Sequence, residues 1–251
     1  MRIVFFGNNW IGLQISQWLQ SQGDEIVALV LHPSNRSKYR EEIIESAGVD
    51  PEFIFDGSKL RDLVTLKAIQ ETRPDIGVSV AFGYILDTEC LNIMPSGCVN
   101  VHSSFLPYNR GAYPNVWSII DRTPSGVSLH YIDDGVDTGD IVAQREIKIE
   151  PVDTGASLYR KLEFASLELF KENWQSLQEG CVHRISQRDK SGTFHRVRDI
   201  EELDEIDLDK SYIARELIDL IRARTFRPHR GTYFYDQGKK VYLYLDMEYE
   251  E

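Results

Sequence analysis

The stretch RIVFFG at Arg2–Gly7, together with the second apolar run IVALVL at Ile26–Leu31, decides the fold. Between them lie a turn containing glycine and the residues Ile11, Ile15 and Leu19, which recur at helical spacing. A helix joining two buried strands is a βαβ unit, because parallel strands need a crossover connection of this length. The sequence therefore predicts an α/β fold with a nucleotide-binding-like (Rossmann-like) sheet at its start.

The same alternation continues along the chain. Strand-like segments are expected at 76–81, 97–102, 126–131 and 140–149, and helices at 60–72, 115–120, 157–177 and 212–222. Residues 231–245 alternate as a hairpin around Asp236-Gln-Gly238. We expect a mostly parallel sheet flanked by helices over residues 1–180. A small C-terminal α+β subdomain over 181–251, with a helix and the hairpin, would serve dimerisation or substrate binding.

The composition and net charge of the chain disfavour nucleic-acid and membrane partners. The 251 residues are 42% hydrophobic, which is enough for a full core, and the formal net charge is −12. Such a charge disfavours a nucleic-acid partner, because polyanion affinity depends on lysine and arginine. No apolar run reaches the roughly 18 residues of a membrane span, and the apolar start is too short for a secretory signal. We therefore expect a cytoplasmic protein without a membrane partner.

The cysteines and histidines do not form a metal-binding pattern. Cys90, Cys98 and Cys181 have no CxxC spacing, so we expect buried, reduced thiols. The six histidines show neither H-x3-H nor H-E-x-x-H. No metal site is expected.

The turn Gly7–Gly12 follows the first strand. It has neither the G-x-G-x-x-G pattern nor a terminal G-K-[ST], so neither a dinucleotide site nor a P-loop is predicted. Its position at the carboxyl edge of the sheet is still where open α/β sheets place ligands. Asn9, within this turn, is a candidate for substrate binding.

The chemistry is carried by Asn100-Val-His102. Residues two apart on a strand point to the same face, so an amide donor and an imidazole can address one reacting atom. Taken alone, the motif favours a structural hydrogen-bonded pair, and other segments are needed to support a catalytic one. His130 lies in another strand-like run and fits either interpretation.

A carboxylate follows in the turn Gly135-Val-Asp-Thr-Gly139. Asp137 near the imidazole would orient it and favour its charged form. A solvated acidic turn is the alternative. A calcium loop is disfavoured, because the D-x-[DN]-x-[DN]-G frame and the bidentate Glu are missing.

Taken together, Asn100-Val-His102, Ser104-Phe-Leu-Pro107 with Arg110-Gly111, and the Asp137 turn resemble the formyltransferases that use N10-formyltetrahydrofolate. The resemblance covers residues 1 to 170 in motif order, with Phe105 replacing an aliphatic residue of the S-L-L-P element. It implies the formyltransferase fold and activity, with Asn100, His102 and Asp137 as the catalytic set.

The resemblance also implies binding residues. The loop Ala81–Leu86 looks like the family's pterin-binding segment, and a structural loop at a strand end is the competing view. We expect the folate to contact Phe82, Tyr84, Ile85, Asp133 and Asp137, and the acceptor to contact Asn9, Ser104, Arg110, Gly111, Tyr113, Arg222 and Arg224.

Three acceptors compete within the family: methionyl-tRNA, glycinamide ribonucleotide and amino sugar-nucleotides. The acidic segment 199–209 disfavours tRNA, and a glycinamide ribonucleotide enzyme would leave residues 181–251 without a purpose. The tail 221–242 resembles sugar N-formyltransferases, which implies a dTDP-4-amino-4,6-dideoxyhexose acceptor, surface-polysaccharide synthesis and a homodimer. A regulator that binds folate or sugar-nucleotide without catalysis is the non-enzyme alternative.

Overall fold

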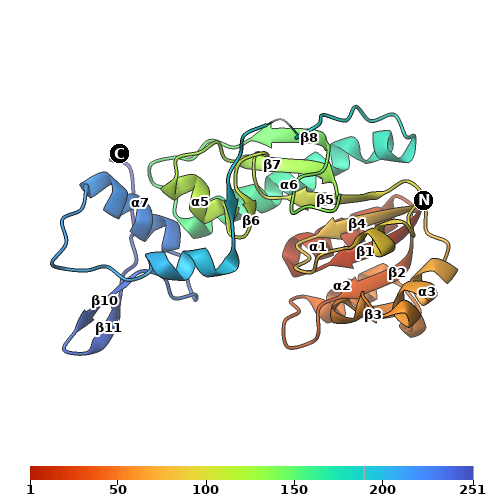
Figure 1. Ribbon diagram of the computed structural model, residues 1–251, viewed down its shortest axis with the longest axis horizontal. Helices are drawn as coiled ribbons and strands as arrows, with labels where there is room; N and C mark the ends of the chain where they lie inside the picture. Colours follow the sequence, from red (N-terminus) through yellow and green to blue (C-terminus); the bar gives the residue numbers. More distant parts are fainter. Residues whose placement is uncertain (189, 251) are drawn as a thin grey trace. The chain divides into compact units, whose positions relative to one another are not determined.

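A computed structural model describes residues 1–188 and 190–250 and begins with the predicted βαβ unit (Figure 1). Strands β1 (Arg2–Gly7) and β2 (Glu25–Leu31) flank helix α1 (Asn9–Ser21). In each strand every residue after the first is buried. Continuous burial is the behaviour of parallel strands that are covered on both faces.

The remaining elements follow in chain order. They are α2 (Arg40–Ala47), β3 (Ile54–Asp56), α3 (Leu63–Glu71), β4 (Ile76–Val80), α4 (Thr88–Leu91), β5 (Cys98–His102), β6 (Arg110–Gly111), α5 (Pro114–Ile120), β7 (Gly126–Tyr131) and β8 (Ile141–Glu146). The C-terminal part adds α6 (Gly155–Gln178), β9 (Phe194–His195), α7 (Ala214–Arg224), β10 (Tyr233–Asp236) and β11 (Lys239–Tyr242). Short 3-10 turns lie at Pro51–Phe53 (η1), Gly57–Lys59 (η2) and Val197–Leu203 (η3).

Seven of these strands form one sheet in the order β3-β2-β1-β4-β5-β7-β8. The pairs β2/β3, β1/β2, β1/β4 and β4/β5 are parallel, whereas β5 and β7 are antiparallel. The prediction of a mostly parallel sheet flanked by helices is confirmed. The antiparallel step matters for function, because it sets His130 of β7 directly opposite Asn100 of β5.

The predicted elements differ from the observed ones mainly where local caps decide the boundary. Helix α3 begins at Leu63 rather than at residue 60, since residues 57–59 form a 3-10 turn. The Asp56 carboxylate caps that turn by accepting a hydrogen bond from the Ser58 N–H at 2.8 Å. Helix α2 and the short strand β3 were not predicted, because neither segment has a long periodic apolar pattern.

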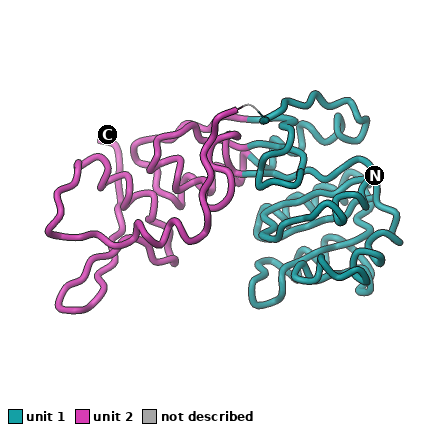
Figure 2. Tube along the Cα trace, viewed as in Figure 1, with its two compact units in different colours: residues 1–102, 128–144, 166–189 teal, residues 103–127, 145–165, 190–251 magenta. Residues whose placement is uncertain are grey.

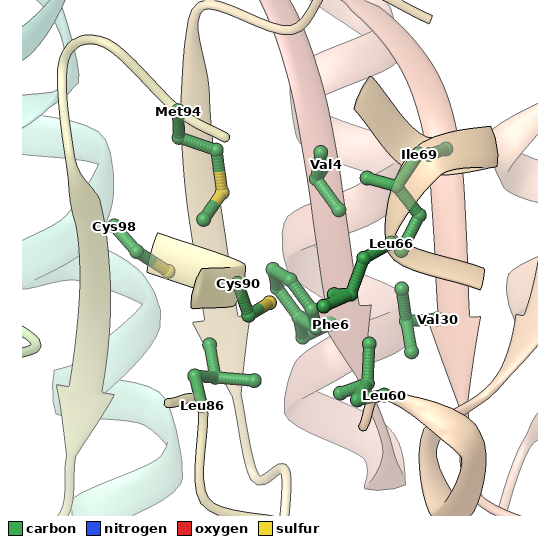
Figure 3. Packing of buried hydrophobic residues seen from close by; sticks show 11 residues of the cluster. Val4, Phe6, Val30, Leu60, Leu66, Ile69, Leu86, Cys90, Met94 and Cys98 are labelled. Atoms are coloured by element: carbon green, nitrogen blue, oxygen red, sulfur yellow. The ribbon is translucent and has the colours of Figure 1, made fainter. Parts of the chain in front are cut away.

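A core cluster fills one face of the sheet (Figure 3). It joins Phe6 of β1 and Val30 of β2 to residues beyond β4, including the thiols of Cys90 and Cys98. Burial raises the pKa of the Cys90 thiol to about 12 and that of Cys98 well above its usual value, so both stay protonated. The prediction of buried thiols is confirmed for these two and wrong for Cys181, which lies exposed just after the end of α6.

The helix expected at 157–177 is present as α6, and one stripe along it is buried, made of Leu158, Leu162, Ala165, Leu169 and Phe170. Its C-terminal half packs on α1, where the rings of Phe170 and Trp18 meet edge to face. None of the helices in the described ranges is long and apolar enough to cross a bilayer.

The buried carboxylate of Asp24 fastens α6 to the N-terminus. It accepts hydrogen bonds from the Met1 ammonium at 2.8 Å, the Trp174 indole at 2.6 Å and the Gln178 amide at 2.8 Å. Three donors thus share the carboxylate of Asp24, a residue that is only 4% exposed.

The chain divides into two compact units that interleave in sequence (Figure 2). Unit 1 comprises residues 1–102, 128–144 and 166–189, and unit 2 comprises 103–127, 145–165 and 190–251. This division differs from the linear boundary at residue 180, which stays a prediction. In unit 2 the predicted hairpin is present as β10 and β11, paired antiparallel around Gln237 and Gly238, which both have positive φ. This is the geometry of a two-residue hairpin turn.

Candidate active site

Strand β5 presents the first two site residues on one face. Burial along Cys98–His102 alternates at its end, with Val101 buried and both Asn100 and His102 partly accessible. The two side chains therefore point to the same side of the strand, as residues two apart must. The His102 side chain is 11% exposed, so a ligand can reach its imidazole.

His130 of β7 completes this face from the neighbouring strand. It is in register with Asn100, and Nδ2 of Asn100 lies 3.2 Å from Nε2 of His130. The other ring nitrogen, Nδ1, lies 2.7 Å from the carbonyl oxygen of Tyr131. Because a carbonyl oxygen only accepts, Nδ1 carries a proton. In neutral His130, Nε2 then accepts the hydrogen bond from the Asn100 amide. The imidazole thus fixes the orientation of the amide group.

The turn after β7 carries Asp137 in a left-handed backbone conformation, with φ of 54°. The turn is held by Asp133, whose Oδ1 accepts from the Gly135 N–H at 3.1 Å and from the Thr138 hydroxyl at 2.6 Å. A Cβ on Gly139 would collide with the carbonyl oxygen of Tyr131, so a side chain does not fit there. The hydrogen bonds of Asp133 and the close packing at Gly139 therefore constrain the backbone of this turn.

The carboxylate of Asp137 lies between two imidazoles. Its Oδ2 is 3.6 Å from Nε2 of His102, and its Oδ1 is 3.5 Å from Nε2 of His130. Both distances are longer than a close hydrogen bond, and the contact with His102 becomes an ion pair when that imidazole is protonated. Asp137 and His102 are almost equally shielded, with side chains 13% and 11% exposed, whereas His130 is 2% exposed. The structure therefore brings Asn100, His102 and Asp137 together, with His130 buried behind them.

This arrangement suits transfer of an acyl group. An amide N–H from Asn100 can stabilise a carbonyl oxygen that becomes negative, because one N–H goes to His130 and an amide nitrogen has two. His102 can accept and return a proton, with a carboxylate beside it to stabilise its charged form. Among residues 1–188 and 190–250, no three His, Cys, Asp or Glu side chains are grouped so as to hold a metal ion.

The loop after β4 holds three of the predicted folate contacts, and the other two, Asp133 and Asp137, lie on the turn after β7. Phe82 packs on the core cluster and stacks on His32, with ring centroids 5.1 Å apart, and Tyr84 lies 5.5 Å from Phe82. Ile85 is 64% exposed. His32 is a packing residue: it is buried, and its Nε2 accepts a hydrogen bond from the Gly83 N–H at 3.0 Å. Burial, followed by the positive charge of Arg36, lowers the pKa of His32. Folate binding by this loop stays a prediction.

The predicted acceptor contacts fall into two groups. Asn9 lies in unit 1 at the start of α1, with φ of 62°. Ser104, Arg110, Gly111 and Tyr113 lie in unit 2, where Gly111 has φ of 87° and a Cβ there would collide with the His195 carbonyl. Ser104 is buried and Tyr113 is 42% exposed. Their contact with a substrate stays a prediction.

Arg222 and Arg224, also predicted to contact the acceptor, are engaged within unit 2. Arg222 donates to the Asp219 carboxylate at 2.8 Å and to the carbonyl of Asp153 at 2.9 Å. Arg224 forms a two-point contact with Asp204 at 2.6 and 2.8 Å. Both guanidinium groups thus have structural partners, which does not favour a pyrophosphate role.

Two residues near the site were not assigned from the sequence. His130 was left open, although Ser-x-His at the end of a strand has the same two-residue period as Asn-x-His. Gln187, which donates to the backbone of the Asp137 turn, has no local signal, since it lies 50 residues away in the chain.

Family models and known proteins match this chain over most of its length. The formyl transferase family matches residues 1–173, and a family described as the N-formyltransferase dimerization C-terminal domain matches residues 199–249. Methionyl-tRNA formyltransferase from Acetivibrio thermocellus is 32% identical over 97% of this chain and 79% of its own length. The dTDP-4-amino-4,6-dideoxyglucose formyltransferase from Mycobacterium bovis is 34% identical over 68% and 75%.

Two solved structures resemble this fold. A 4-N formyltransferase from Francisella tularensis has a TM-score of 0.83, with 27% identity over 99% of this chain and 98% of its own. The formyltransferase PseJ from Anoxybacillus kamchatkensis, solved with UDP-4,6-dideoxy-4-formamido-L-AltNAc and tetrahydrofolate, has a TM-score of 0.59 and 28% identity, covering 80% of this chain and 89% of PseJ.

Proposed function

Because this chain belongs to the formyl transferase family and is a formyltransferase, we propose that it moves a formyl group from N10-formyltetrahydrofolate to a nucleotide-linked amino sugar. The acceptor class is a dTDP-4-amino-4,6-dideoxyhexose. The proposal rests on one observation: the side chains of Asn100, His102 and Asp137 lie close together at the end of β5. Formyl transfer needs an oxyanion donor and a proton relay at the same place.

The C-terminal residues support the sugar acceptor over methionyl-tRNA. Residues 199–249 match the N-formyltransferase C-terminal domain, and the Francisella 4-N formyltransferase covers this chain from end to end. The methionyl-tRNA formyltransferase from Acetivibrio has about a fifth of its length outside the match with this chain. In this chain, the segment 199–209 is strongly acidic. A negative segment repels the phosphate backbone of tRNA.

The reaction follows from the positions of three side chains. The neutral amine of the acceptor attacks the formyl carbon, and Asn100 donates a hydrogen bond to the carbonyl oxygen as it becomes negative. One such donor is worth about 3 kcal/mol of transition-state stabilisation. The C–N10 bond then breaks, and the proton lost by the attacking amine goes to the departing N10.

His102 is the group placed to move that proton, because its imidazole is partly accessible and an imidazole nitrogen can accept and return a proton. Asp137, 3.6 Å from Nε2, stabilises the imidazolium while the proton is held. We expect Phe82, Tyr84 and Ile85 to hold the folate and Asn9 to contact the sugar-nucleotide.

One assay tests the acceptor. Purified protein is incubated with N10-formyltetrahydrofolate and, in separate reactions, with dTDP-4-amino-4,6-dideoxyglucose, glycinamide ribonucleotide or charged initiator methionyl-tRNA. Mass spectrometry then identifies the formylated product. We expect the sugar-nucleotide to be the best acceptor by kcat/KM. Faster turnover of methionyl-tRNA would overturn the proposed acceptor and leave formyl transfer intact.

The same proposal includes a cytoplasmic homodimer acting in surface-polysaccharide synthesis. The match of residues 199–249 to a dimerization domain supports the dimer. Gel filtration with light scattering checks it, because a monomer would elute at the mass of one 28.9 kDa chain.

A further inference from the structure

The segment that follows α6 is docked on the strands that flank the Asp137 turn. Ile185 and Ile141 exchange two backbone hydrogen bonds, each of 2.9 Å. One residue earlier, the Arg184 guanidinium lies 3.5 Å above the ring of Tyr131. These contacts fix residues 184–187 beside both ends of the turn. All of these residues belong to unit 1.

Gln187 is the residue of this segment that reaches the turn itself. Its amide Nε2 donates to the carbonyl oxygen of Gly139 at 2.6 Å and to that of Asp137 at 3.1 Å. The residue is only 2% exposed, so water cannot readily replace these two bonds. A buried polar group that is this well satisfied is costly to disturb, and its hydrogen bonds restrict where the backbone can lie.

The two carbonyls belong to the residue that carries the carboxylate and to the glycine two positions later. Asp137 has a left-handed φ of 54°, a conformation that a residue other than glycine adopts at a cost. The Asp133 carboxylate holds the turn from inside through Gly135 and Thr138. Gln187 holds the same turn at two backbone carbonyls, those of Asp137 and Gly139, on either side of Thr138.

We propose that Gln187 is a positioning residue for formyl transfer, which holds the Asp137 backbone so that the carboxylate stays beside His102. The inference rests on the catalytic role proposed for Asp137. Without the amide, both carbonyls lose a donor and the turn can shift. Displacements near 1 Å at a reacting centre reduce rates by about 100-fold in well-ordered sites. The loss should appear mainly in kcat, because the carboxylate beside His102 is assigned to proton transfer, and the predicted folate contacts Phe82, Tyr84 and Ile85 lie outside this turn.

The test uses Gln187→Met, which keeps the length of the side chain and removes both donors, and Gln187→Ala. Turnover is measured with N10-formyltetrahydrofolate and dTDP-4-amino-4,6-dideoxyglucose, or with methionyl-tRNA if that proves the better acceptor. We expect kcat to fall about 10- to 100-fold, with both KM values changed less than about threefold. Gln178→Ala is the matched control, since that amide also bonds a buried group, the Asp24 carboxylate, but lies outside the site.

A double-mutant cycle separates positioning from a structural role. If Gln187 acts through Asp137, then Gln187→Met should cost nothing further in kcat once Asp137→Ala is present. Equal losses in both backgrounds would overturn the inference, and so would a kcat within twofold of wild type in a folded Gln187→Met protein. Full activity of Asp137→Ala alone would overturn the catalytic role of Asp137 and the inference with it. If Gln187→Ala fails to fold, the Met variant decides.

Discussion

The amide nitrogen of Asn100 and Nε2 of His130 lie 3.2 Å apart across two antiparallel strands, at positions directly opposite in register. The bond fixes the orientation of the Asn100 side-chain amide, the proposed donor to the reacting carbonyl. His130 is itself fixed by its Nδ1–H, which donates to the Tyr131 carbonyl at 2.7 Å. A buried histidine thus orders the amide that we propose as the oxyanion donor.

His130→Ala is therefore expected to lower kcat about tenfold, the equivalent of losing one neutral hydrogen bond that orders Asn100. His130→Gln should retain more activity, since its carbonyl oxygen can replace Nε2 as an acceptor. Steady-state kinetics compares the two variants. Equal kcat values for wild type and His130→Ala would show that Asn100 does not need this support.

Each of the three proposed catalytic side chains should be required for a normal kcat. We expect Asn100→Ala, His102→Ala and Asp137→Ala to cut kcat at least about 100-fold, the usual effect of removing an oxyanion donor or a proton relay. Single-turnover assays with saturating substrates measure the chemical step. His183→Ala is the control, because that histidine is exposed and lies outside the site. Near-normal turnover in the His102 variant would refute the proposed proton relay.

Asp24 is expected to matter for stability rather than for catalysis. Asp24→Asn leaves the Met1 ammonium without its buried counter-charge, and losing one partner of a buried pair costs roughly 3 kcal/mol. Urea denaturation measures the free energy of unfolding. The control is Glu25→Gln, which removes an exposed ion pair with Arg2 and should change stability by less than about 1 kcal/mol. Similar losses in both variants would contradict this account.

The stability of the protein should depend on pH through His32. Burial, and then Arg36, lower the pKa of His32 in the folded state, so the unfolded chain binds a proton more readily. The contribution of His32 is therefore complete above the unfolded-state pKa of about 6.5 and is lost as the pH falls through the folded-state pKa. His32→Gln keeps an acceptor for Gly83 and does not titrate.

Urea denaturation at pH 7.5 and pH 5.5 tests this expectation for both proteins. Wild type should lose more stability than His32→Gln on acidification. A pH response that is identical in the two proteins would place the acid sensitivity at other groups.

Much of the fold could be read from local pattern. We predicted β1, β2 and α6 correctly, because their buried positions are apolar and follow the spacing of a strand or a helix. The boundary of α3 was displaced by the Asp56 cap, a side-chain interaction that periodicity does not register. The short strand β3 is held by its pairing with β2, which a segment of three residues cannot reveal.

The sequence by itself determined that Asn100 and His102 share a face, because strand geometry has a period of two, and it identified Asp137 through a glycine-rich turn. Only the tertiary structure decided that one carboxylate lies between two imidazoles, and that Gln187, 50 residues away, donates to the turn that carries it. Strand periodicity is encoded locally. Distances between segments remote in the chain arise from sheet order and packing, which no short stretch of residues specifies.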